Sequence, residues 1–188
     1  MDKNDNALIL VDLQKDFLPG GALGVKEGDL IVDRVNNLIK KCKYLFKAIV
    51  ATRDWHPKDH CSFKETGGPW PAHCIQGSSG AEFASKLILP DDVIVISKGT
   101  SREKDAYSGF EGTDLLKKLT ELKIKRLYVA GIATDYCVKH TVLDGLQNDF
   151  EVFVIEDCIK GVTPATATEA INDMKRHGAI FITSKDIC

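Results

Sequence analysis

The chain has 188 residues, of which 44% are hydrophobic and 28% charged, and its formal net charge at pH 7 is −2. This composition is typical of a soluble globular protein, and the length suits one domain, residues 1–188, with little left for a second. The small net charge and the absence of a basic segment argue against binding to nucleic acid or to an anionic membrane.

The cellular compartment is predicted from the N-terminus and the cysteines. Residues 1–6 are polar and lack a signal-peptide pattern, and no apolar run approaches the roughly 18 residues of a membrane span. Six cysteines are scattered without a C-x-x-C pair. We therefore expect a cytoplasmic protein whose cysteines are reduced thiols rather than a disulfide framework.

Short apolar runs rich in Val and Ile alternate with stretches of helical periodicity. The runs predict strands buried on both faces at residues 7–11, 48–52, 93–97, 127–132, 152–155 and 179–182. The periodic stretches predict helices at residues 32–46, 115–119, 138–146 and 163–177. The last helix opens with Thr163-Pro164 and ends before Gly178. This alternation indicates an α/β fold with a parallel sheet covered on both faces.

Residues 19–24, PGGALG, follow the first predicted strand and invite a comparison with phosphate-binding loops. The glycines do not fall at G-x-G-x-x-G, and no Gly-Lys-Ser/Thr follows them. We interpret the segment as a flexible turn close to a site.

Chemically reactive side chains follow four of the predicted strands at their carboxyl ends, where open α/β sheets bind ligands. Asp12 follows the first strand, Asp54 and His56 follow the second, Lys98 follows the third, and Cys137 lies just after the fourth. Each has an ordinary alternative, such as a turn cap, a solvated amine or a packed thiol. Their arrangement along one edge is difficult to explain by chance and predicts a functional site there.

Cys137 falls in the first turn of the helix predicted after the fourth strand. A helix N-terminus carries about half a positive charge and unpaired N–H groups, which stabilise a thiolate. We therefore expect a lowered thiol pKa and a nucleophilic cysteine. The alternative is a buried cysteine that acts only as a small hydrophobic residue.

Asp54 and His56 lie two residues apart in an extended segment, so their side chains point the same way. They open an irregular region, residues 54–80, of the kind that is usually functional in a compact domain. A carboxylate with imidazoles suits zinc, iron or manganese, and the alternative is a set of hydrogen-bonded loop histidines. The candidates for a third ligand are His60, Glu65 and His73. A structural zinc would instead use His60, Cys61, His73 and Cys74.

Six motifs occur in order along nearly the whole chain. They are VDLQKDF at 11–17, TRDWHP at 52–57, WPAHC at 70–74, SKG at 97–99, AYSGF at 106–110 and GIATDYCV at 131–138. In this order they resemble the nicotinamidase (pyrazinamidase/nicotinamidase) family of the isochorismatase-like cysteine hydrolases. The metal segment is the most specific, because many relatives in that superfamily lack it.

The resemblance implies a three-layer α/β/α fold with a six-stranded parallel sheet in the order 3-2-1-4-5-6. It implies a catalytic triad of Asp12, Lys98 and Cys137, in which Lys98 also helps to lower the thiol pKa. It implies a cis peptide between Ile132 and Ala133, with the N–H groups of Ala133 and Cys137 forming an oxyanion hole.

The resemblance also implies one divalent metal, zinc in preference to iron or manganese. Its ligands would be Asp54, His56 and His73, and His60 or Glu65 are candidates for a further position. Three aromatic residues would wall a pocket for a flat ring, and these are Phe17, Trp70 and Tyr107.

The implied reaction is hydrolysis of nicotinamide to nicotinate and ammonia through a cysteine thioester, as in NAD salvage, with pyrazinamide as a second substrate. Two other functions stay open at this point. One is a metal-independent cysteine hydrolase of another small amide, ureide or hydroxamate, and the other is a non-catalytic metal or redox protein with the same fold. The sequence permits a homo-oligomer without requiring one.

Overall fold

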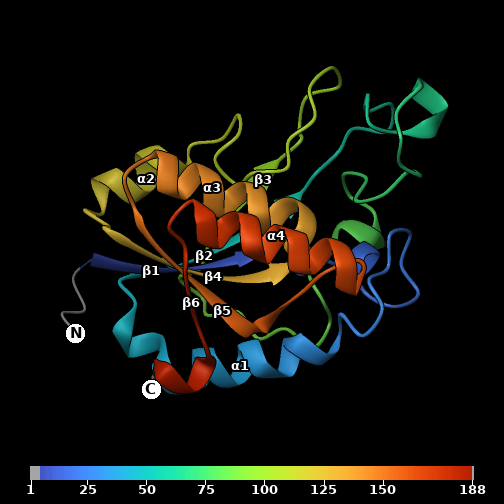
Figure 1. Cartoon of the computed structure of the whole chain (residues 1–188). Helices are drawn as coiled ribbons and strands as arrows, with labels where there is room; N and C mark the ends of the chain where they lie inside the picture. The colour runs from blue at the N-terminus through green and yellow to red at the C-terminus, as the bar shows by residue number, and fades with distance from the viewer. Residues whose placement is uncertain (1–4, 188) are drawn as a thin grey trace.

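A six-stranded parallel sheet forms the centre of the molecule, in the order β3-β2-β1-β4-β5-β6 (Figure 1). The structure is a computed structural model, and it describes residues 5–187, so that residues 1–4 and Cys188 lie outside the described part. The fold class and strand order expected from the sequence are confirmed.

All six predicted strands and all four predicted helices are present. The strands are β1 Asn6–Val11, β2 Ala48–Asp54, β3 Ile94–Lys98, β4 Arg126–Ile132, β5 Glu151–Lys160 and β6 Ile180–Ile182. The helices are α1 Leu30–Cys42, α2 Leu115–Glu121, α3 Lys139–Gln147 and α4 Pro164–Arg176. The clearest difference in length is β5, which has 10 residues and continues well past its predicted end.

The sheet is covered on both faces, as β1 shows most directly. Ala7, Ile9 and Val11 belong to a core cluster that includes residues of α2, α3 and α4. Leu8 and Leu10 belong to a second cluster with residues of α1 on the other face. Figure 1 shows α1 on one side of the sheet and the other three helices opposite. Because successive strand residues point to opposite faces, a strand buried on both sides is apolar throughout.

The helical segment after β4 begins differently from the prediction. Thr134–Val138 form a single π-helical turn, and α3 follows it without a break. Cys137 therefore lies in a π turn and not in the first turn of an α-helix. Single π turns inside helices occur frequently at functional sites.

The last helix has the predicted signals at both ends. The Thr163 side chain accepts a hydrogen bond from the Thr166 N–H, and Pro164 stands at the first helical position. Gly178, just past the end, has a φ of 103°, which glycine adopts without steric cost.

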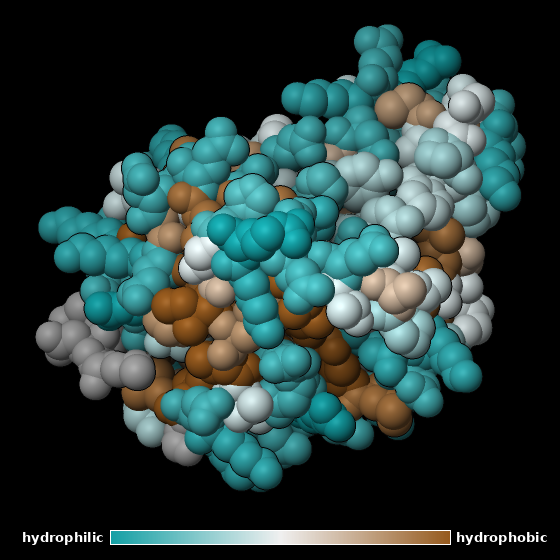
Figure 2. Space-filling view, in the orientation of Figure 1, coloured by the Kyte–Doolittle hydropathy of each residue, from teal (hydrophilic) through white to brown (hydrophobic). Residues whose placement is uncertain are grey.

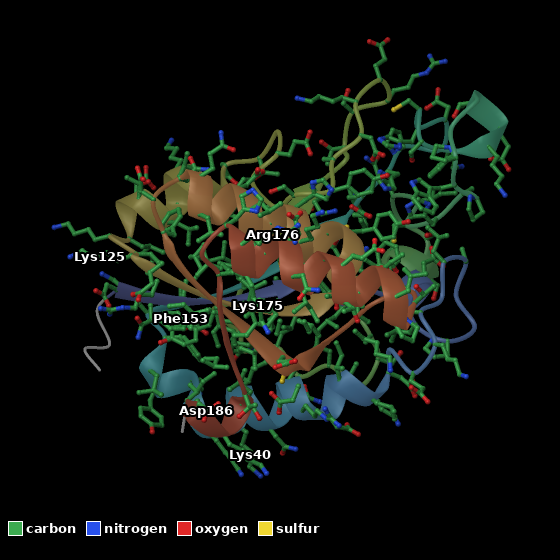
Figure 3. All side chains as sticks on the ribbon, in the orientation of Figure 1. Lys40, Lys125, Phe153, Lys175, Arg176 and Asp186 are labelled. Carbon is green, nitrogen blue, oxygen red and sulfur yellow. The ribbon has the colours of Figure 1, made fainter. Side chains whose placement is uncertain are left out.

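The β6 edge of the sheet is left partly open. Figure 2 shows apolar residues at the surface in the band between α4 and α1, where Figure 1 shows β5 and β6, and Ile180 of β6 is 41% exposed. The ammonium of Lys175, labelled in Figure 3, lies 4.8 Å from the centre of the Phe181 ring. A short edge strand with a lysine beside it limits pairing with another chain.

The cysteines depart from the prediction at one position. Cys61, Cys74, Cys137 and Cys158 are free, but Cys42 at the end of α1 is disulfide-bonded, so the expectation of thiols throughout is wrong there. That expectation rested partly on the absence of a C-x-x-C pair. This pattern concerns only bridges between cysteines that are close together in the sequence. Within residues 5–187, no helix is long and apolar enough to span a membrane.

Gly131 allows β4 to approach β1 at the edge that carries the reactive residues. Its φ is 132°, and a Cβ atom built there would lie 2.1 Å from the Val11 carbonyl oxygen. The register between β4 and β5 also shifts beside it, between Val129 and Gly131. A residue with a side chain would have to move β1 or β4 to fit.

We therefore predict that Gly131→Ala lowers the free energy of unfolding by at least about 3 kcal/mol, because backbone strain and a backbone clash add together. The matched control is Gly112→Ala, since Gly112 has a φ of 67° but a Cβ atom added there would meet no heavy atom within 4 Å. The control should lose only about 1 kcal/mol. Urea denaturation measures both, and equal losses would contradict the close approach of β4 to β1.

Candidate active site

Three buried side chains meet at the carboxyl edge of the sheet. Asp12 directly follows β1, Lys98 is the last residue of β3, and Cys137 lies in the π turn after β4. Their exposed fractions are 0%, 1% and 6% respectively. Since parallel strands end at the same edge, residues far apart in the sequence reach one point.

The ammonium of Lys98 lies at the centre of this group. Its Nζ atom is 2.9 Å from Asp12 Oδ2 and 2.5 Å from Asp54 Oδ1. It is also 3.4 Å from Cys137 Sγ and donates a hydrogen bond of 3.2 Å to the Ala106 carbonyl. Burial alone would lower the pKa of Lys98, but the Asp12 and Asp54 carboxylates raise that pKa well above its usual range. The amine is therefore a permanent cation.

The two oxygens of Asp12 have different surroundings, since Oδ1 accepts a hydrogen bond from Thr52 and Oδ2 forms the ion pair with Lys98. The Thr52 hydroxyl donates a 2.6 Å hydrogen bond to Oδ1, while no hydrogen bond of good geometry within the described chain reaches Oδ2. Burial raises the pKa of Asp12, the Lys98 ammonium opposes this, and the Asp54 carboxylate adds to it. A ligand atom each of Asp12, Asp54 and Cys137 lies within 4.8 Å of the others, so the carboxylate is close enough to accept the thiol proton.

The pKa of the Cys137 thiol differs from the expectation. Burial raises this pKa well above its usual range, Lys98 opposes the shift, and the Asp12 and Asp54 carboxylates reinforce it. The expected lowering is wrong, because sequence patterns do not show how deeply the thiol is buried or how many carboxylates face it. The direction of this shift favours the thiol form, which lies beside the Asp12 carboxylate as a proton acceptor.

A second group, made of Asp54, His56 and His73, adjoins the first. Ligand atoms of all three lie within 4.8 Å of one another. The Nε2 atoms of His56 and His73 are 3.6 Å and 4.0 Å from Asp54 Oδ2. Burial would raise the pKa of Asp54, but the Lys98 ammonium lowers it below its usual value, so this carboxylate stays ionised.

Backbone carbonyls fix both imidazoles in the orientation that a metal requires. His56 Nδ1 lies 2.8 Å from the Gly99 carbonyl oxygen, and His73 Nδ1 lies 2.8 Å from that of Pro71. We assign the proton to each Nδ1, which leaves the Nε2 lone pairs facing Asp54. Two such nitrogens and an ionised carboxylate fit a divalent cation such as zinc.

The Gln14 side chain forms a pair of hydrogen bonds with the Asp54 backbone. Its amide nitrogen donates to the Asp54 carbonyl at 2.8 Å, and its amide oxygen accepts from the Asp54 N–H at 2.7 Å. The Gln14 side chain is completely buried. This paired contact fixes the end of β2 and, through it, the direction of the Asp54 carboxylate.

The two further ligand candidates lie differently. His60 stacks on His56 with ring centres 4.1 Å apart, but its Nδ1 bonds Ser62 Oγ at 2.7 Å and its Nε2 bonds the Lys104 carbonyl at 3.2 Å. Glu65 is exposed in a short 3-10 turn, Lys64–Thr66. In the described part of the chain, His60 belongs to a separate group with His56 and Asp105, whose ligand atoms lie within 4.8 Å of one another, and Glu65 belongs to no such group.

A cavity of about 300 Å³ opens above both groups, and Asp54, His73 and Cys137 all contribute to its wall. The predicted pocket residues Phe17, Trp70 and Tyr107 line it as well. The indole N–H of Trp70 donates a 3.0 Å hydrogen bond to the Tyr107 hydroxyl, and the Phe17 ring lies 5.8 Å from that of His73. The cavity thus combines aromatic walls with a thiol and a cation-binding group.

The peptide bond between Ile132 and Ala133 is cis, as expected from the resemblance. Ala133 and Cys137 both line the cavity, so the two residues expected to supply oxyanion donors border the same space. Their role as donors stays a prediction.

Comparisons with known proteins agree on one family. A family model described as the isochorismatase domain matches residues 6–186. The nicotinamidase of Escherichia coli K12 is 40% identical over 203 residues, which cover 96% of this chain and 95% of that protein. This chain belongs to the isochorismatase family.

Solved structures of this family superimpose closely on the chain. The pyrazinamidase of Pyrococcus horikoshii in complex with zinc is 51% identical, with a TM-score of 0.92, and the match covers 95% of this chain and 99% of that one. The PnC1 protein of L. infantum in complex with nicotinate is 37% identical, with a TM-score of 0.93, covering 98% and 96%.

Sequence reasoning did not identify every residue that lines the cavity. Tyr136 lines the pocket, and its ring packs edge-on against Trp70 at 5.4 Å and lies 6.0 Å from Tyr107. It directly precedes Cys137, and this adjacency was the available signal. The π turn directs two successive side chains toward one cavity, which an α-helical prediction does not anticipate. Val25 and Val162 also line the cavity and were not anticipated, whereas Ala22, Leu23 and Gly24 belong to the turn that the sequence placed close to a site.

We predict that the chain binds one divalent metal ion and that His56→Ala combined with His73→Ala reduces its occupancy below about a tenth, because only one protein ligand remains. Elemental analysis of the purified proteins measures this. The matched control is His60→Ala, which removes a neighbouring imidazole whose two nitrogens already have protein partners, and it should keep its metal. Full occupancy in the double variant would contradict the assigned ligands.

Proposed function

We propose that this protein is an amidohydrolase that converts nicotinamide to nicotinate and ammonia through a thioester on Cys137. One observation carries the proposal: Cys137, whose thiol lies close to Asp12, borders the same aromatic cavity as Asp54 and His73 of the candidate cation site. The E. coli relative is a nicotinamidase, and the L. infantum structure holds nicotinate. The P. horikoshii pyrazinamidase supports pyrazinamide as a second substrate.

The reaction begins with the thiol proton. Asp12 takes it through Oδ2, the oxygen that Thr52 does not hold and that lies 2.9 Å from the Lys98 ammonium. Burial has raised the pKa of this carboxylate, so it accepts protons more readily than an exposed one. The Cys137 thiolate then attacks the amide carbon, with Lys98 at 3.4 Å from the sulfur stabilising the charge.

The remaining steps use the same residues. The N–H groups of Ala133 and Cys137 stabilise the oxyanion, a contribution worth about 3 kcal/mol per donor in other hydrolases. Protonated Asp12 returns its proton to the departing ammonia, which leaves the thioester. Asp12 then activates a water molecule, whose attack releases nicotinate and restores the thiol.

The aromatic walls orient the ring. Phe17, Trp70 and Tyr107 hold it flat, and the hydrogen bond between Trp70 and Tyr107 keeps those two rings fixed. Asp54, His56 and His73 would hold a divalent cation, which we propose to be zinc because the P. horikoshii structure is a zinc complex. Bound there, the cation would supply a Lewis-acidic partner for the pyridine nitrogen.

Two properties of the whole protein stay predictions. The sequence indicated a cytoplasmic location and permitted a homo-oligomer. Cell fractionation tests the first, and light scattering on the purified protein tests the second.

We expect the purified protein to release ammonia from nicotinamide, and we expect Cys137→Ala to lower kcat/KM by about a thousandfold or more, because no nucleophile remains. Coupled ammonia detection measures both. The matched control is Cys61→Ala, since Cys61 is a free cysteine that does not line the cavity. The proposal fails if Cys137→Ala retains more than about a hundredth of the activity while the protein remains folded.

Benzamide provides the test of substrate choice, because it differs from nicotinamide in one ring atom. Stacking on aromatic walls hardly senses that atom, whereas a polar partner left empty costs about 1–3 kcal/mol or more. We predict that kcat/KM for nicotinamide exceeds that for benzamide by at least about a hundredfold, equivalent to about 2.7 kcal/mol. The ratio should shrink in the His56→Ala, His73→Ala double variant. Equal rates on both amides would favour a metal-independent hydrolase of another amide.

A further inference from the structure

A carboxylate outside the proposed catalytic group joins two separate walls of the cavity. Asp16 Oδ2 accepts a 2.7 Å hydrogen bond from the Cys74 N–H, and Asp16 Oδ1 accepts a 3.3 Å bond from the Ala22 N–H. The Asp16 carbonyl also accepts from the Leu23 N–H at 2.9 Å. One residue is therefore bonded both to the histidine segment and to the glycine-rich segment.

Cys74 is the point at which the two histidine segments are connected. It directly follows His73, and its carbonyl accepts a 2.9 Å hydrogen bond from the His56 N–H. Its φ of 46° lies in the left-handed region, which is unfavourable for a residue with a side chain and therefore needs support. The Asp16 carboxylate supplies that support on the N–H side of the same residue.

The glycine-rich segment, residues 19–25, forms the opposite wall. Ala22, Leu23 and Val25 line the cavity together with His73 and Cys137. The segment is largely exposed elsewhere, and its backbone is tied to residues 16–18: the Val25 N–H donates to the Phe17 carbonyl at 3.0 Å, and the Gly21 N–H donates to the Leu18 carbonyl at 2.9 Å. Its position over the cavity thus depends on where Asp16 lies.

Two glycines, Gly80 and Gly21, leave the space that Asp16 occupies. A Cβ atom at Gly80 would lie 2.2 Å from Asp16 Oδ2, and one at Gly21 would lie 2.5 Å from Asp16 Cα. Three loops from different parts of the chain therefore close around one carboxylate. A carboxylate enclosed in this way has little freedom to exchange its hydrogen-bond partners.

We propose that Asp16 is a positioning residue that couples the cation site to the wall formed by residues 19–25. Fixing His56 and His73 on a cation fixes Cys74, and the hydrogen bond from Cys74 fixes the carboxylate that holds Ala22. Occupancy of the cation site then orders the pocket wall that contacts the substrate. The coupling rests on the proposed cation site but needs no assumption about the substrate's identity.

Hydrogen exchange with and without Zn²⁺ alone tests the coupling. In the wild type, Zn²⁺ should slow amide exchange both in residues 71–76 and in residues 19–25. In Asp16→Ala, Zn²⁺ should still slow exchange in 71–76, but the protection of 19–25 should fall by about fivefold or more. Asp16→Asn is the second variant in case the first does not fold, because it keeps one acceptor oxygen, and it should lose the coupling in part.

Steady-state kinetics supply the second readout. Loss of an ordered wall should raise KM for nicotinamide about tenfold in Asp16→Asn while kcat changes less than about threefold, since the reacting groups are untouched. The matched control is Asp91→Asn, because Asp91 is an exposed loop carboxylate, and it should behave as the wild type in both experiments.

The possible failures are distinguishable. If Zn²⁺ binds and protects residues 19–25 equally in the wild type and in a folded Asp16 variant, the coupling is wrong and the cation site stands. If Zn²⁺ does not bind the wild type at all, the cation site and the coupling are both wrong. Ammonia release from nicotinamide is a separate result and decides only the substrate.

Discussion

The site is organised by one buried cation, the Lys98 ammonium. An ammonium that is 1% exposed has lost almost all of its water, and such a charge is stable only when opposite charges and hydrogen bonds replace that water. Asp12 at 2.9 Å and Asp54 at 2.5 Å provide the charges, and the Ala106 carbonyl provides a further acceptor. Removing either carboxylate would leave a buried charge without full compensation.

The strand order explains how these groups come together. The sheet order places β3, β2, β1 and β4 side by side, and their ends carry Lys98, Asp54, Asp12 and the turn with Cys137 in that same sequence. Lys98 starts at the far end of this row, and its long side chain brings Nζ to 3.4 Å from the Cys137 sulfur although β2 and β1 lie between β3 and β4. Asp54 contacts Lys98 through one oxygen and faces the histidines through the other. The nucleophile and the cation site therefore share one carboxylate, and a change in charge at either is felt by the other.

Sequence reasoning recovered the parts of the molecule that local patterns determine. The apolar runs indicated all six strands, and the residues that follow them include most members of the two buried groups, with His73 coming from the loop that follows β2. The π turn, the thiol pKa and the disulfide at Cys42 were not predicted, because hydropathy and residue spacing do not report helix type, depth of burial or the pairing of cysteines. His60 illustrates the same limit: its position in the loop suits a ligand, but Ser62 and Lys104 occupy both of its nitrogens.

The site depends on the π turn at residues 134–138, whereas the fold does not. Such a turn corresponds to an α-helix with one additional residue, and each residue of an α-helix advances about 100° around the axis. Deleting one residue there would give a more regular helix with better hydrogen bonding. The same deletion would rotate the side chains before it relative to α3, and the cavity would lose its pairing of thiol and tyrosine. A lineage could thus discard the chemistry by a change that improves the helix, and a well-folded relative need not be an active one.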